Sequence, residues 1–152
     1  MKVKMIAPLF AALVSSAALA QVTVGEPWVR ATVPHQKATG AFMRLTAATD
    51  ARLVEARSPI AAVVEVHEMV MEQEVMKMRA VPGLDLPAGK TVELKPGGYH
   101  VMLIDLEEQV KEGGTVPLTL IVEGTDGKRE SIDVVAPVRP LNSARATHMP
   151  KH

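Results

Sequence analysis

After residue 20, short apolar runs rich in Val, Leu, Ile and Thr alternate with turn-forming residues at intervals of about ten, a spacing typical of β-sandwiches and barrels. The run over 116–123 alternates imperfectly, with Leu118, Leu120 and Val122 on one face, and predicts a central strand with both faces partly covered. The pattern predicts strands over 22–30, 40–47, 52–56, 63–71, 75–80, 90–94, 100–106, 116–123 and 130–138. The sequence therefore predicts an all-β sandwich of about eight to nine strands.

The turns between these runs have recognisable chemistry. Thr125-Asp126-Gly127 predicts a hairpin, because glycine tolerates the positive φ that tight turns require. The stretch 61–78 could form a helix, since Glu, Met and Ala are good helix formers. Its β-branched run over 63–66 favours a hairpin instead, with a turn near 72–74. That hairpin would bring residues 76–78 alongside His67.

The first 20 residues have the features of an export signal. A positively charged start precedes a short apolar run over 5–14, and Ala18-Leu19-Ala20 resembles a signal-peptidase site. The apolar run is too short to span a bilayer, although an uncleaved anchor is an alternative. We therefore expect cleavage after Ala20, a periplasmic location, a folded domain over 21–140 and a flexible tail over 141–152, which lacks periodicity.

Composition narrows the possible functions. The 17 basic and 17 acidic side chains balance, and the loss of Lys2 and Lys4 with the signal would leave a formal charge of −2. A chain with no basic surplus and few aromatic residues is poorly suited to nucleic acid or to stable membrane attachment. Cysteine is absent, so the domain is held by its core alone and cannot form the thiolate ligand of a blue-copper centre.

Four residues carry the strongest chemical signal: His67, Met78, His100 and Met102. Residues two apart on a strand point to the same face, so His100 and Met102 can approach one ion. Imidazole and thioether donors suit a soft metal, above all Cu(I), whereas Zn(II) prefers thiolate or carboxylate. Sequence spacing leaves open which methionine completes such a site, because Met69, Met71 and Met76 lie near Met78.

Other candidates have simpler interpretations. Met43 is expected in the core, His35 in a solvated loop, and Trp28 as a packing anchor. The sequence has no Gly-x-Ser-x-Gly, phosphate-loop or His-Glu-x-x-His motif, so nothing in it suggests an enzyme.

The four candidate residues have the spacing His67-x10-Met78-x21-His100-x-Met102, and Gly97-Gly98-Tyr99 directly precede His100. In this arrangement the chain resembles the periplasmic PCu(A)C copper chaperones. Further similar segments are 28–32, 40–43, 84–89 and 113–120. The resemblance implies a cupredoxin-like Greek-key β-sandwich that binds one Cu(I) near its surface, with Met78 as the ligand among the clustered methionines. It also implies delivery to the dinuclear copper centre of a respiratory terminal oxidase, directly or through a thiol-bearing partner chaperone.

Three functional alternatives stay open at this point. The same site could serve a periplasmic copper scavenger or resistance protein with no dedicated acceptor. The chain could also be a metal-free β-sandwich interaction module whose methionines only fill the core. Finally, the tail residues His148, Met149 and His152 could hold a second, weaker copper, better suited to Cu(II) through its imidazoles.

Overall fold

A computed structural model describes residues 21–141 as ten β-strands, and this part of the chain contains no helix. The predicted signal peptide and almost all of the predicted tail lie outside the described residues. The strands are β1 (Val22–Arg30), β2 (Ala38–Ala47), β3 (Ala51–Arg57), β4 (Ala61–Glu72), β5 (Val75–Ala80), β6 (Leu84–Leu86), β7 (Thr91–Leu94), β8 (His100–Leu106), β9 (Thr115–Gly124) and β10 (Arg129–Arg139). In the described part, no helix is available that could cross a membrane.

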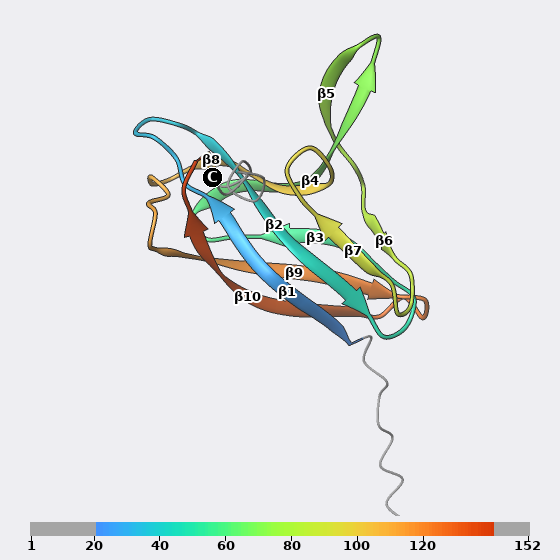
Figure 1. Ribbon diagram of the computed structural model, residues 1–152. Coiled ribbons are helices and arrows are strands. Elements are labelled where there is room, and N and C mark those ends of the chain that lie inside the picture. The colour runs from blue at the N-terminus through green and yellow to red at the C-terminus, as the bar shows by residue number, and fades with distance from the viewer. Residues whose placement is uncertain (1–20, 142–152) are drawn as a thin grey trace, which may run out of the picture.

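The strands form one hydrogen-bonded series in the order β5-β4-β8-β2-β1-β10-β9-β3-β6, and β7 pairs separately with β2. All pairs are antiparallel except β1 with β10. The series folds over so that β3 approaches β4 and β6 approaches β2 without ladder pairing. Two layers result, and the β4–β5 hairpin projects from one end of them (Figure 1).

The core lies between the layers and is built from alternate residues of each strand. In β2, Ala41, Met43 and Leu45 are buried against the opposite layer. The strand β9 runs between β10 and β3, and its Leu118, Leu120 and Val122 are almost fully buried, which confirms its predicted central position. Since the inward positions of β2 and β8 form the core, the intervening residues point to the outer surface of the layer.

The predicted all-β sandwich is confirmed, and each of the nine predicted strands corresponds to a strand of the structure. The prediction of eight to nine strands misses β6, which lies between the predicted strands over 75–80 and 90–94. This strand has only three residues, and its side chains alternate buried, exposed, buried. It pairs with β3 alone, so its existence depends on a distant partner rather than on a long local pattern.

The hairpin that joins β4 and β5 is also confirmed. Its turn residues Gln73 and Glu74 have φ angles of 49° and 65°, as both central residues of a type I′ turn require. At the other predicted hairpin, between β9 and β10, Gly127 has φ of 77°. The first hairpin fixes the register Met69–Met78 and Met71–Met76, so the four methionines share one face.

Candidate metal centre

The two predicted histidine ligands are brought together by the β4–β8 ladder. His67 and His100 are directly opposed in register, and their ring centroids are 5.9 Å apart. Both project from the outer surface of the layer, because their neighbours Val66 and Val101 are buried on the core side. Even so, His100 is only 5% exposed. Two imidazoles from different strands thus lie at one partly shielded position.

A pocket of about 280 Å³ lies beside His100 and is lined by methionines from three strands. Its lining includes Met69 of β4, Met78 of β5 and Met102 of β8. On the β2 side the residue opposed to Met102 is Gly40, whose lack of a side chain leaves room for the tip of the Phe42 ring. Three of the four residues singled out in the sequence, Met78, His100 and Met102, therefore line one pocket. The fourth, His67, lies directly opposite His100 across the β4–β8 ladder.

The hydrogen bonds of His100 define which of its nitrogen atoms can donate a lone pair. Its Nδ1 lies 3.1 Å from the carbonyl oxygen of Gly98. A carbonyl can only accept, so Nδ1 carries the proton and Nε2 keeps the free lone pair. Burial lowers the pKa of His100 below its ordinary value of 6.5, and this effect exceeds that of the Gly98 hydrogen bond, which raises the pKa. The ring is therefore held neutral, the form that a metal ligand needs.

His67 has the complementary arrangement. Its Nε2 lies 2.8 Å from a carboxylate oxygen of Glu65, which favours a proton on that nitrogen. Its Nδ1 is buried and has no hydrogen-bond partner. A buried unpaired nitrogen is costly, so an atom that accepts its lone pair would remove that cost. Each histidine thus offers one lone pair while its other nitrogen is held by a protein oxygen, as is usual for metal-bound imidazole.

An aromatic and cationic wall closes the other side of the pocket. The ring of Phe42 lies 6.2 Å from that of His100 and 4.5 Å from that of Trp28, measured between centroids. The guanidinium of Arg30 lies 5.3 Å from the centre of the Phe42 ring, and that of Arg139 lies 5.2 Å from the centre of the Trp28 ring. These apolar faces restrict access of water to the buried side of His100.

The sequence prediction did not include the wall residues Arg30, Gly40 and Phe42. Their signal is weak but present, because they occupy the strand positions that alternate with core residues such as Val29 and Ala41. A large aromatic side chain at an outward strand position indicates that other side chains or a bound group cover it. Trp28 is confirmed as a packing residue, since it stacks on Phe42.

The other histidine and methionine candidates, His35, Met43, Met71 and Met76, do not line the pocket. Met43 is 2% exposed and belongs to the core, as predicted. His35 is exposed in the loop before β2, also as predicted. Met71 and Met76 are 69% and 47% exposed further along the hairpin, and Met78 is 46% exposed. The hypothesis that these clustered methionines only fill the core is therefore wrong for these three.

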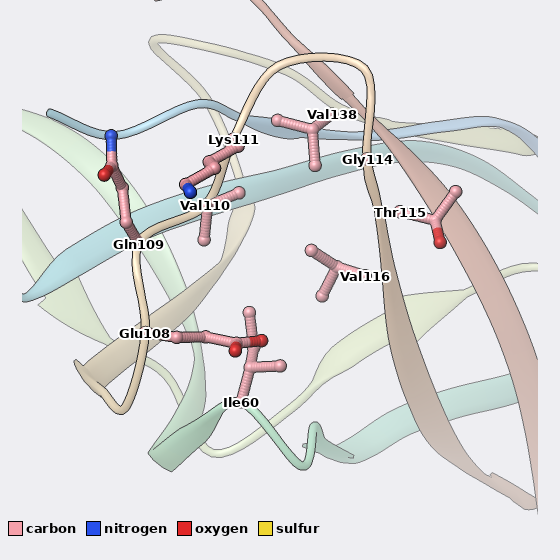
Figure 2. A pocket seen from close by; sticks show the side chains of 9 residues that line it. All are labelled: Ile60, Glu108, Gln109, Val110, Lys111, Gly114, Thr115, Val116 and Val138. Carbon is pink, nitrogen blue, oxygen red and sulfur yellow. The ribbon is translucent and has the colours of Figure 1, made fainter.

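A larger pocket, of about 430 Å³, lies elsewhere, among the loop between β8 and β9 and the ends of neighbouring strands (Figure 2). Its lining includes Ile60, Glu108, Val110 and Lys111, and contains neither histidine nor methionine. Within residues 21–141 no group of three or more His, Cys, Asp or Glu side chains is placed to hold a metal.

Comparisons by sequence find relatives of this chain. The family model "Putative lipoprotein LpqE-like" matches residues 22–138. A curated protein of Leifsonia xyli subsp. xyli, "Putative lipoprotein Lxx21020", is 30% identical over 128 residues, which cover 84% of this chain and 75% of that protein.

Solved structures agree in fold. The Cu(I) form of DR1885 from Deinococcus radiodurans is 36% identical, with a TM-score of 0.59, and the match covers 82% of this chain and 83% of that one. The copper-bound PCuAC domain of PmoF2 is 22% identical, with a TM-score of 0.60 over 80% of this chain and 97% of that one. The predicted cupredoxin-like fold is confirmed by these neighbours. The chain belongs to the LpqE-like family, which is the PCu(A)C family of copper-chaperone domains indicated by the sequence resemblance.

Proposed function

We propose that the protein binds one Cu(I) through His67, Met78, His100 and Met102 and delivers it to the dinuclear copper centre of a respiratory terminal oxidase. The observation that carries this proposal is the pocket beside His100, where methionines from three strands meet a histidine held neutral by burial. Copper is the cargo here, not a resident cofactor.

The donor set fits this cargo. Thioethers are soft, neutral ligands that favour Cu(I) over harder ions, and the two imidazoles add affinity. The unpaired Nδ1 of His67 and the free Nε2 of His100 provide two lone pairs on adjacent strands. The absence of any thiolate keeps binding weaker than at a cysteine site, so a thiol-bearing acceptor can take the ion.

Ligand exposure supports transfer rather than storage in the interior. Met78 is 46% exposed, whereas His100 is 5% exposed. The ion would therefore be held from beneath by a buried imidazole and covered from outside by an accessible thioether. An incoming acceptor ligand could displace Met78 first, because that donor is the one within reach of solvent.

We further propose that the signal peptide is cleaved off after Ala20 and that the mature protein acts in the periplasm. The names of the family and of its Leifsonia relative both refer to lipoproteins. Bacterial lipoproteins carry their lipid on a cysteine thioether, and none of these 152 residues is a cysteine. None of these residues can therefore carry that modification.

Titration of the chain from residue 21 onward with Cu(I), followed by mixing with the apo copper domain of a terminal oxidase, tests the proposal. Uptake of a tightly bound equivalent and its movement to the acceptor are expected. Met102→Leu serves as the binding-deficient comparison, and a thiol-bearing partner chaperone can be added to detect relayed transfer. Tight binding without transfer to either acceptor would instead identify a scavenger, and the absence of binding would identify a metal-free module.

A further inference from the structure

The β4–β5 hairpin has two chemically different faces. On one face Glu68 forms an ion pair with Arg79 at 2.7 Å, and Glu72 forms one with Lys77 at 3.4 Å. These pairs lie across the ladder and account for the charged side chains of that face. On the other face, all residues beyond His67 and Ala80 are methionines. The charged side chains and the thioethers therefore lie on opposite faces of the hairpin.

The sulfur face consists of two directly opposed pairs, Met69 with Met78 and Met71 with Met76. Met69 and Met78 line the pocket beside His100, whereas Met71 and Met76 lie one pair further out. Met71 is 69% exposed, the highest value among the large hydrophobic side chains of the described residues. The pocket is therefore continued outward by a row of solvent-accessible thioethers.

Packing does not explain the outer pair. Residues that favour exposed strand positions are β-branched or aromatic, and methionine is not among them. Directly opposed side chains on an antiparallel pair have Cβ atoms roughly 5 Å apart, so two flexible thioethers can reach the same ion. Assignment of Met78 to the inner site leaves three thioethers on this face, those of Met69, Met71 and Met76.

We propose that Met71 and Met76, with Met69 beside them, form a second binding site for Cu(I) or another soft monovalent ion. The proposal uses the inner site only to assign Met78. Because this outer site has neither imidazole nor a buried wall, it binds more weakly than the inner one and fills second. The Met69–Met78 pair lies between the two sites, so an ion taken up outside is next to a donor of the inner pocket.

Silver(I) and Cu(I) titrations of the chain from residue 21 onward test this proposal, with the methionine methyl groups followed by NMR. Two equivalents should bind. The methyl signals of Met78 and Met102 should move with the first, and those of Met71 and Met76 with the second. In Met71→Leu/Met76→Leu, which keeps the volume and apolarity of this face, the second equivalent should be lost and the first retained.

Two control variants separate the alternatives. Val75→Leu changes an exposed apolar residue on the charged face and should keep both equivalents. A triple variant with His148→Ala, Met149→Leu and His152→Ala, at positions outside the described residues, should also keep both. Persistence of the second equivalent in the Met71/Met76 variant, or its loss in the triple variant, would overturn the proposal. A wrong assignment of the inner site would give a different result, because Met102→Leu would then bind the first equivalent as tightly as the parent does.

Discussion

His67 and His100 are directly opposed across the β4–β8 ladder, although they lie far apart in the chain. The rings of Phe42 and Trp28 extend this pair into a row of four rings, one on each of four neighbouring strands. The distances between ring centroids are 5.9 Å from His67 to His100, 6.2 Å from His100 to Phe42, and 4.5 Å from Phe42 to Trp28. The proposed metal centre is thus one end of a row that reaches β1. Changes in this row are expected to affect both copper binding and the stability of the layer.

Replacement of Met102 by Leu should lower Cu(I) affinity by at least about tenfold, or ~1.4 kcal/mol, since it removes a soft donor and little volume. A competition titration with a Cu(I) chelator measures the change. Met43→Leu is the matched control, because Met43 is buried in the core away from the pocket. If both variants bind Cu(I) as the parent does, Met102 is not a ligand.

The stability of the metal-free protein should fall as the pH decreases through the range where His100 gains a proton. Burial lowers the pKa of His100 in the folded state, so the unfolded chain binds this proton more readily. The stabilising effect is therefore complete above the ordinary value of 6.5 and is lost as the pH drops through the lower folded value. Urea denaturation at several pH values should show a shallower decline in His100→Gln, which cannot titrate. An equal decline in both proteins would contradict this assignment.

Gly40→Ala should destabilise the fold by about 1–3 kcal/mol through overpacking. A Cβ atom at Gly40 would lie 2.9 Å from the tip of the Phe42 ring, which is held against Trp28. Fluorescence of Trp28, the sole tryptophan, should also shift. At Gly25 an added Cβ would meet Arg44 at an ordinary 3.6 Å, so Gly25→Ala should be much less harmful. Equal effects of the two substitutions would show that the Phe42 contact is not the cause.

Glu74→Gly should stabilise the hairpin by roughly 0.5–1 kcal/mol, because glycine adopts positive φ without strain. Glu74 has a φ of 65° in the turn between β4 and β5. Thermal unfolding and hydrogen exchange across Met71–Met76 should both show the gain. Ser131→Gly, on an exposed position of β10 with extended backbone, should have the opposite sign. A loss of stability in Glu74→Gly would exclude strain at this turn.

Sequence features predicted the strands well where the signal is local. An apolar run after the turn residues Gly97 and Gly98 located β8, and the β-branched run over 63–66 distinguished the β4–β5 hairpin from a helix. The three-residue β6 was missed, because Leu84 and Leu86 give too short a pattern and their partner β3 lies far away in the chain.

The proposed site was predictable in its donors and not in its walls. The spacing of His100 and Met102 on one strand is a local property, and it places both on one face. The opposition of Gly40 to Met102 depends on the register between β2 and β8, which sequence spacing does not specify. The involvement of Phe42 depends on the same register.

The position of β5 has a consequence for how the ion could leave. β5 is the outermost strand of its layer, pairs with β4 alone, and has only exposed residues. Segments that bury little surface open locally at a small fraction of the free energy needed for global unfolding. Separation of β5 from β4 would withdraw Met78 while β8 keeps His100 and Met102 in the folded sandwich. Copper release could then proceed by fraying of one edge strand, without unfolding of the sandwich that holds the remaining donors.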